Sequence, residues 1–340
     1  MRWTKTRICA CLLLVGILLA SLSGCGSQQT DGVELLNVSY DPTRELWRDL
    51  NARFIPEYEQ QSGQRVVIQQ SHASSGSQAR AVLDGLEADV VTLALWSDTD
   101  ALRKKGLIRE GWQERLPEHS LAYFSTIVFV VRKGNPKGIK DWPDLIKPGV
   151  EVVTPNPKTS GNGRLSFLAA WGAVRRRGGS ESEARDFVTQ LYQHAPVLDN
   201  GARGSTTTFA QKKIGDVHLT WENEAYLEIA ETTGELEIVY PPVSIRAEPF
   251  VAVVDANVDR KDTRAVAEAY LNFLYTERAQ HILAKHHYRP INEAVRKQYT
   301  AQLPELTLFP ITTVAESWDD AQQKFFASGA IFDSIYQANH

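Results

Sequence analysis

Short apolar stretches alternate with segments of helical periodicity along most of the chain. Residues 90–95 and 127–131 are almost continuously apolar, which is typical of strands that are buried on both faces of a sheet. Between such stretches, apolar residues recur at helical spacing, as at Leu46, Leu50 and Phe54. The alternation predicts an α/β fold in which helices cover largely parallel sheets. Further strands are expected at residues 35–39, 66–68, 150–153, 217–220 and 251–254.

Small residues and helix-capping residues gather where the expected strands meet the expected helices. Five such junctions lie at residues 41–45, 74–77, 159–163, 201–206 and 221–224. The start of a helix has backbone N–H groups without internal partners and carries the positive end of the helix dipole. Several converging helix starts can therefore bind an anion without lysine or arginine. Capping alone explains any single junction more simply, so the prediction of an anion site depends on several of them meeting.

The first 25 residues have the order of a bacterial secretory signal. Basic residues come first, residues 8–20 are apolar, and Leu22-Ser23-Gly24-Cys25 follows. The apolar run is shorter than the ~20 residues that span a bilayer as a helix. The last four residues resemble a lipobox, in which the cysteine is lipidated and becomes the mature N-terminus; a cleaved signal with an incidental cysteine is the alternative. We expect a lipoprotein signal at 1–25, lipidation at Cys25 and a polar tether at 26–33.

Composition and charge narrow the class of partner. About 300 residues follow the tether, a length that suggests two compact lobes. The formal net charge is −4, and removal of Arg2, Lys5 and Arg7 with the signal leaves about −7. There is no basic run, which argues against nucleic acid as a partner. Besides Cys25 the only cysteines are Cys9 and Cys11, inside the signal, so no disulfide is expected.

The common catalytic and metal-binding motifs are missing from the sequence. No serine stands in a G-x-S-x-G elbow, and there is no G-x-x-x-x-G-K-[ST] phosphate loop. The adjacent pair His286-His287 would point apart on a helix, which disfavours a shared metal ion. We expect no catalytic residue, no metal site and no cofactor, and the chain is not expected to be an enzyme. The arginines near the junctions are expected to brace loops; they are Arg44, Arg80, Arg164 and Arg203.

Several strings in the chain resemble the bacterial periplasmic sulfate-binding proteins, the sulfate and thiosulfate type of ABC-transporter substrate-binding protein. They include LNVSYDPTRE at 36–45, PNPKTSG at 155–161, GARG at 201–204, WENE at 221–224 and YRP at 288–290. Shorter strings at 70–72, 89–95 and 131–136 also resemble this family. The resemblance runs in order from about residue 35 to the C-terminal end, and its strings are long and unusual.

The resemblance implies an organisation and a function. The expected fold is α/β, of the type II periplasmic-binding-protein kind, with two lobes joined by a hinge. Lobe 1 would comprise residues 34–124 and 248–305, lobe 2 residues 125–247, and a C-terminal helical segment, 306–340, would pack on the lobes. The protein would be a monomer in the periplasm or on the outer face of the cell membrane, anchored by lipid, delivering sulfate to the membrane permease of an ABC importer.

The family binds sulfate with neutral donors only, and its positions can be carried over to this chain. One lobe would supply backbone N–H groups at Asp41 and Ser75. The other would supply the hydroxyl and backbone of Ser160, the backbone N–H groups of Gly161, Asn162 and Ala202, and the indole N–H of Trp221.

The chain departs from the family pattern at several positions. Asn162 stands where a second glycine is usual, as it does in the thiosulfate-binding relatives, whereas Trp221 favours sulfate. Residues 73–76 read Ala-Ser-Ser-Gly in place of Gly-Gly-Ser-Gly, and Leu165 replaces a common aromatic residue. Sulfate is the expected ligand, with a thiosulfate-preferring or molybdate receptor as the alternative and a sulfate-ester hydrolase least favoured.

Overall fold

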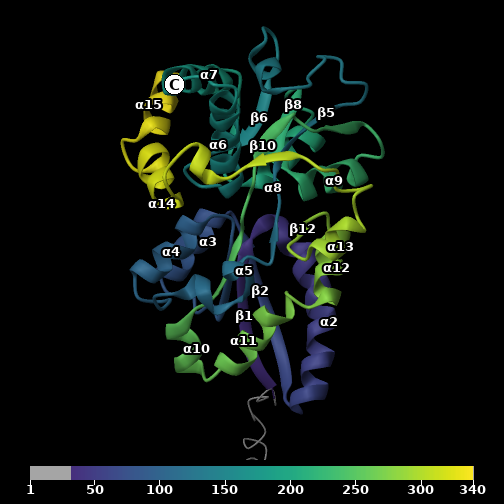
Figure 1. Ribbon diagram of the computed structural model, residues 1–340, viewed down its shortest axis with the longest axis vertical. Coiled ribbons are helices and arrows are strands. Elements are labelled where there is room, and N and C mark those ends of the chain that lie inside the picture. Colours follow the sequence, from purple (N-terminus) through teal and green to yellow (C-terminus); the bar gives the residue numbers. More distant parts are fainter. Residues whose placement is uncertain (1–31, 340) are drawn as a thin grey trace, which may run out of the picture.

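The computed structural model describes residues 32–339 (Figure 1). The expected signal, the lipidation site Cys25 and most of the expected tether lie outside these residues. The last two residues assigned to the tether, Gly32 and Val33, begin the first strand. Across the described range, no helix combines the length and the apolarity needed to cross a bilayer.

The first sheet forms the core of one lobe, called lobe 1 here, in the lower half of Figure 1. Its strand order is β11-β3-β1-β2, with β1, β2 and β3 parallel and β11 antiparallel to β3. The strands are β1 (Gly32–Tyr40), β2 (Arg65–Ala73), β3 (Val90–Leu93) and β11 (Phe250–Val253). Alternate residues of β3 enter different cores, because Val90 packs with α2 and α11 while Val91 packs with α3 and α4. Helices therefore cover both faces of this sheet.

The main helices of lobe 1 lie around the first sheet. They are α2 (Arg44–Ser62), α3 (Ser75–Leu83), α4 (Trp96–Lys104), α10 (Asp255–Lys261), α11 (Arg264–Phe273), α12 (Glu277–Lys285) and α13 (Glu293–Lys297). The stripe of apolar residues expected after the first strand is the buried face of α2, where Leu46, Leu50 and Phe54 pack beneath the sheet. A short turn of 3-10 helix, η1 (Asp41–Thr43), links β1 to α2, with Pro42 at a position where a missing N–H costs nothing.

The second sheet forms the core of lobe 2, and its strand order is β7-β6-β8-β5-β9. The strands are β5 (Ile127–Arg132), β6 (Val152–Pro155), β7 (Leu198–Asp199), β8 (Val217–Trp221) and β9 (Leu236–Val239). The pairs β6–β7 and β6–β8 are parallel, whereas β5 runs antiparallel to both β8 and β9. The main helices are α6 (Gly161–Arg176), α7 (Glu181–Gln193), α8 (Ala202–Thr206) and α9 (Glu222–Glu231). Two of the four strand pairs are parallel, because β5 alone runs against the direction of the other four strands.

Three segments connect the lobes. The first runs from β4 (Tyr123–Phe124) to β5, and the second from β10 (Val243–Ile245) to β11; Ser125 and Ala247 pair as an isolated bridge between them. The third leads to β13 (Thr307–Phe309), which pairs with β10 in lobe 2. Near the first, β4 pairs with β12 (Arg289–Pro290). The three segments pass between the lobes at one place, which we call the hinge.

The C-terminal segment packs mainly on lobe 2. It contains η5 (Ile311–Thr313), α14 (Trp318–Ala321) and α15 (Ile331–Asn339), and α15 lies against α7 (Figure 1). Phe309 reaches the surface of α6 so closely that a Cβ at Gly172 would lie 2.2 Å from its ring. The segment reaches lobe 1 at α14, which packs against α4 and where Lys104 pairs with Asp319 at 2.5 Å. The segment is thus part of the core of lobe 2 and touches lobe 1 at its edge.

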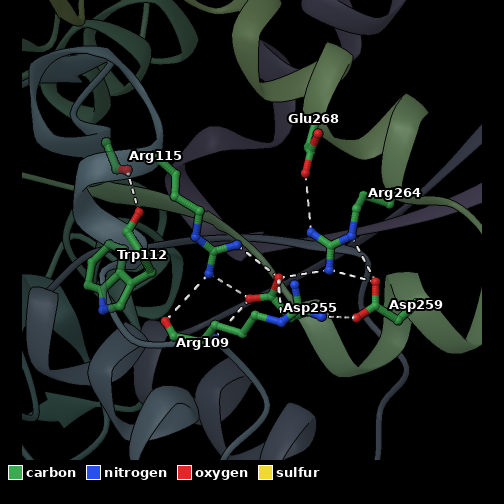
Figure 2. Close-up of polar contacts among 8 residues, drawn as sticks. Arg109, Trp112, Arg115, Asp255, Asp259, Arg264 and Glu268 are labelled. Carbon is green, nitrogen blue, oxygen red and sulfur yellow. Dashed lines mark hydrogen bonds and ion pairs between the residues drawn. The ribbon is translucent and has the colours of Figure 1, made fainter.

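A buried carboxylate ties together separate segments of lobe 1 (Figure 2). Asp255, at the start of α10, accepts hydrogen bonds from Arg115 at 2.6 and 2.8 Å, from Arg264 at 2.9 Å and from the Arg109 N–H at 2.8 Å. Its side chain is only 4% exposed. Burial alone would raise the pKa of this carboxyl, but these donors outweigh it and lower the pKa to about 2.

Replacing Asp255 by asparagine should lower the free energy of unfolding by about 3 kcal/mol at pH 7, because it removes the acceptor shared by arginines of different segments. The folded-state pKa lies below the ordinary value, so this stabilisation is present above about pH 4 and is lost as pH falls toward 2. Urea unfolding followed by tryptophan fluorescence measures the difference. Asp262→Asn, on the exposed end of the same helix, is the matched control. An Asp255→Asn variant as stable as the control would show that the cluster is not a stabilising one.

Candidate anion-binding site

Helix starts from both sheets meet between the two lobes. Gly161, which opens α6 in lobe 2, faces lobe 1 so closely that a Cβ there would lie 2.4 Å from the Ala94 Cβ and 3.3 Å from the Ser75 Cβ. Gly201, just before α8, also lies close to lobe 1, since a Cβ added there would lie 3.2 Å from the Ser74 Cβ. The junctions that the sequence singles out are therefore brought together by the closure of the two lobes.

The lobe 1 side is built on Ser75, the first residue of α3. Its hydroxyl donates to Asp98 at 2.6 Å and accepts from the Ala94 N–H at 3.0 Å, so the side chain is fully used inside lobe 1. Its backbone N–H has no acceptor among residues 32–339. The hydroxyl thus fixes the loop while the N–H remains available, which fits the backbone role expected for this residue.

Asp41 contributes a carboxylate as well as an N–H. Its Oδ2 lies 3.4 Å from the backbone nitrogen of Arg203 on the opposite lobe, and a Cβ at Gly201 would lie 2.9 Å from the same oxygen. Burial raises the pKa of this carboxyl above its ordinary value, although the N–H groups of Arg203 and of Asp41 itself act in the other direction. The Asp41 N–H therefore faces its own carboxylate, and an anion in the cleft would have to replace that carboxylate as its acceptor.

Lobe 2 presents three consecutive residues at the start of α6. The Ser160 hydroxyl caps the helix by accepting from the Gly163 N–H at 3.4 Å, which leaves its proton free to be donated. The backbone N–H of Ser160 is already bonded to the Asn156 carbonyl at 2.9 Å, so the hydroxyl is its only open donor. The N–H groups of Gly161 and Asn162 have no acceptor in the described part of the chain.

The Asn162 side chain turns toward β8. It is buried, and its amide donates to the Leu219 carbonyl at 3.2 Å. The residue that departs from the usual glycine therefore leaves its own backbone unobstructed. At the start of α8, the N–H of Ala202 is likewise without an acceptor among residues 32–339.

Trp221 ends β8 and closes the site from lobe 2. Its ring is fully buried and packs on Tyr40 of lobe 1, with 5.3 Å between ring centroids. Within residues 32–339 nothing accepts a hydrogen bond from its indole N–H, whereas the indole of Trp142 donates to the Val243 carbonyl. Two other buried indoles, of Trp47 and Trp171, also have no acceptor, so position at a junction is what distinguishes Trp221.

Two of the four arginines near the junctions are neutralised by carboxylates, whereas Arg44 and Arg80 are exposed and form no ion pair within residues 32–339. Arg164 pairs with Asp98 across the two lobes at 2.6 Å, and both side chains are more than nine-tenths buried. Arg203 pairs with Glu45 of lobe 1 at 2.6 Å and with Glu224 at 2.8 Å. Both arginines therefore hold the lobes together and do not offer a free charge to a ligand, as expected of braces.

The titratable groups around the site are perturbed by burial. Burial raises the pKa of the Glu224 carboxyl to about 8 despite its contact with Arg203. Burial also lowers the pKa of His72 to about 4, so this imidazole is neutral near pH 7. Its two nitrogens lie 3.0 Å from the Ser39 hydroxyl and 2.7 Å from the Gln70 side chain. His72 thus supports the loop beside Ser75.

A cavity of about 210 Å³ lies beside the donors, between the lobes. Arg203, Glu45 and Glu224 line it, and a stack of Tyr226 on His287, with ring centroids 3.8 Å apart, stands at its side. None of the seven predicted donors lines this cavity. In residues 32–339 no three histidine, cysteine, aspartate or glutamate residues are placed to hold a metal ion.

The structure brings all seven predicted residues to junctions at the facing edges of the sheets. Sequence reasoning missed Asp98 and Ala94, which position Ser75 and form the floor opposite Gly161. The only local signal for Asp98 is an acidic residue in the first turn of a helix, which is too common to mark a site.

Comparisons with known proteins identify the family of the chain. A family model described as bacterial extracellular solute-binding protein matches residues 47–289. The sulfate-binding protein of Salmonella typhimurium is 53% identical over 305 residues, 89% of this chain and 93% of that protein. The thiosulfate-binding protein of Pseudomonas aeruginosa is 46% identical over 324 residues, which are 95% of this chain and 98% of that protein. The solved sulfate-binding protein SubI from Mycobacterium tuberculosis has a TM-score of 0.78 at 30% identity, covering 86% of this chain and 99% of its own.

Proposed function

The chain belongs to the bacterial extracellular solute-binding proteins, and we propose that it is a sulfate receptor that supplies an ABC-type importer. The observation that carries the proposal is the convergence of neutral donors from two lobes at a place where the arginines that join the lobes, Arg164 and Arg203, are already paired with carboxylates. Fully ionised sulfate accepts hydrogen bonds and donates none, so such a site suits it. The names of the relatives at 53% and 46% identity point to the same class of ligand.

The free energies are consistent with donors of this kind. Burying an isolated divalent anion would cost tens of kcal/mol, so the ion must be fully hydrogen-bonded. Seven donors are assigned to it: five backbone N–H groups, one hydroxyl and one indole. A hydrogen bond to a charged partner contributes roughly 1.5–3 kcal/mol. Because this contribution is already net of desolvation, seven such bonds are enough to offset the cost of association and leave the ~8 kcal/mol that corresponds to micromolar binding.

Lobe closure follows from the division of these donors. Asp41 and Ser75 belong to lobe 1, while Ser160, Gly161 and the remaining donors belong to lobe 2. A ligand held by both lobes binds the closed conformation more tightly than the open one and so shifts the population toward it. The closed shape is the form that the membrane permease would recognise.

Calorimetric titration with sulfate, thiosulfate and molybdate tests the proposal. We expect sulfate to bind most tightly. Asn162 and the thiosulfate-binding relative make thiosulfate the second candidate, and tighter binding of thiosulfate would assign that ligand instead. Incubation with a chromogenic sulfate ester tests the enzymatic alternative, for which the absence of released chromophore is expected.

Replacing Trp221 by phenylalanine tests the most specific of the assigned donors. The variant keeps an aromatic ring against Tyr40 but removes the indole N–H. Sulfate binding should weaken by roughly 1.5–3 kcal/mol, with little change in thermal stability. Trp171→Phe is the matched control, because its indole is buried without an acceptor far from the junctions. Equal sulfate affinity in wild type and Trp221→Phe would remove this residue from the site.

The lipid anchor is a separate proposal. Leu22-Ser23-Gly24-Cys25 is the basis for placing the mature protein outside the cytoplasmic membrane, anchored through Cys25. Mass spectrometry of the mature N-terminal peptide should find an acylated cysteine, and Cys25→Ala should abolish the modification. A wild-type protein that is soluble and carries no acyl group would contradict the anchor while leaving sulfate binding untouched.

A further inference from the structure

A second cavity lies at the hinge, and none of the seven predicted donors lines it. Its volume is about 340 Å³, within the range of small-molecule sites. Its lining comes from all three connecting segments and from α13 and β12: Phe124, Arg246, Arg289, Arg296, Leu303 and Leu308 are among the residues. Leu308 belongs to β13, on lobe 2, whereas Phe124 and Arg289 belong to lobe 1. The cavity is therefore bounded by both lobes.

Three arginines are held in fixed positions around it. The Arg246 guanidinium lies 4.2 Å from the centre of the Phe124 ring, and that of Arg296 lies 5.5 Å from the same ring. Arg289 is buried and forms a two-fold hydrogen bond with Glu222 at 2.7 and 2.8 Å. The aromatic face and the buried carboxylate thus pre-organise the cations before any ligand arrives.

Arg296 is the arginine whose charge is not balanced. Arg246 has Glu248 at 2.7 Å and Arg289 has Glu222, but Arg296 pairs with no carboxylate among residues 32–339. One of its amino groups donates to the carbonyls of Pro290 and Ile291, and the remainder of its guanidinium has no acceptor in that range. Burial lowers its pKa, and repulsion from Arg246 and Arg289 adds to this against the opposing effect of Glu293.

The rim carries two acidic residues, Glu293 and Glu305, and neither forms an ion pair with Arg296. Glu293 pairs with Lys297 at 2.7 Å, and both of these side chains are mostly exposed. Glu305 is exposed on the rim and forms no ion pair within the described range. Leu303, Leu306 and Leu308 supply apolar wall opposite the arginines.

We propose that this hinge cavity is a second binding site, for a small organic anion whose carboxylate or phosphate group meets Arg296 beside Arg246 and whose apolar part contacts the leucines. A guanidinium with free N–H groups, crowded by two others, gains most from a planar or tetrahedral oxyanion. The leucine wall and the volume of the cavity leave room for an apolar organic group attached to the anionic one. An inorganic oxyanion alone would not fill the apolar part of the cavity.

Phenyl phosphate is the probe, titrated calorimetrically at pH 8, where a phosphate monoester with a second pKa of ~6 is doubly charged. Saturating sulfate is present throughout, so that the cleft is occupied and the lobes are held in one arrangement. Wild type should bind the probe, and Arg296→Gln should bind it at least tenfold more weakly. Arg296→Lys keeps the charge and should lose less of the affinity for the probe. Glu305→Gln should bind it at least as tightly as wild type. Inorganic phosphate should bind more weakly than phenyl phosphate.

Sulfate affinity and the thermal midpoint of each variant are measured alongside. Both should match wild type, which separates the hinge site from the cleft and from misfolding. If Arg296→Gln proves unstable, Arg246→Gln replaces it with the same expected loss. Absence of phenyl phosphate binding to wild type, or binding that the arginine variants do not weaken, would overturn the proposal. Benzyl alcohol binding as tightly as phenyl phosphate would overturn it too, because the anionic group would then contribute nothing.

Discussion

Replacing Gly161 by alanine is expected to weaken sulfate binding by about a hundredfold to ten-thousandfold. The new Cβ would lie 2.4 Å from the Ala94 Cβ, whereas carbon atoms in contact are ~3.5–4 Å apart. The lobes would have to part by at least ~1 Å, which stretches the hydrogen bonds from Asp41 and Ser75 beyond their useful length. Loss of these two charge-assisted bonds, at roughly 1.5–3 kcal/mol each, accounts for the expected range. Calorimetric titration with sulfate measures it.

The double variant Ala94→Gly with Gly161→Ala is the control that tests the mechanism. The nearest atoms to the Cβ at position 161 would then be the Ser75 Cβ at 3.3 Å, a slightly tight contact, and the Cα at position 94 at 3.7 Å, so much of the sulfate affinity should return. Gly161 begins α6 and needs no left-handed conformation, so alanine there should not destabilise lobe 2. Full sulfate affinity in Gly161→Ala alone would mean that the ligand-bound lobes do not meet at this point. Equal losses in the single and double variants would mean that the methyl acts inside lobe 2.

Local signals explain which parts of this fold the sequence could predict. A helix start leaves a trace within a few residues, such as Pro42 after Asp41 or the capping Ser160, and these junctions lie where the pattern placed them. The buried strands β3 and β5 could be identified too, because a near-continuous apolar run is also a signal contained within a few residues. Strand direction leaves no such trace, because side chains alternate in the same way in both directions, and so the antiparallel placement of β5 was not foreseen.

Contacts between distant segments were also beyond the sequence. The ion pair of Arg164 with Asp98 joins residues 66 positions apart, and nothing near either residue indicates the other. The same holds for the Arg203 contact with Glu45, and for the Asp41 carboxylate at the start of α8. The resemblance to a known family assigned seven donors, but it could not say that the Ser160 N–H is already used by Asn156. That distinction depends on how the loop before α6 folds.

The neutral character of the site makes ligand protonation the basis of selectivity. The mature chain is acidic overall, and Arg164 and Arg203 are paired with carboxylates, so the proposed site uses local N–H groups to hold an anion. Such groups are donors at every pH, and they do not distinguish anions by charge alone. They distinguish an anion that carries a proton from one that does not, because a donor cannot accept that proton.

Sulfate should therefore be preferred over phosphate by at least roughly a hundredfold. Phosphate carries at least one proton near neutral pH, and in this site that proton would face another donor or remain unpaired. An unsatisfied buried group costs ~1–3 kcal/mol, and sites built on hydrogen bonds can discriminate much more strongly. The Asp41 carboxylate is the nearby group able to accept the proton, but it lies against the Arg203 N–H in the opposite lobe. Competition titration of sulfate-bound protein with phosphate measures the ratio.

The pH dependence of sulfate affinity separates this explanation from one in which a titrating side chain faces the ligand. Burial lowers the pKa of His72 to about 4, so the imidazole is neutral from pH 5 to 8 and cannot lend a charge that is lost within that range. Sulfate itself does not titrate there, so its affinity should be nearly constant. A gradual decrease is expected only as pH approaches and passes 8, where Glu224, with its pKa raised to about 8, becomes negative beside Arg203. An affinity that collapses as pH rises through 6.5, or comparable affinities for phosphate and sulfate, would place Asp41 or His72 against the ligand and would contradict a site made of neutral donors.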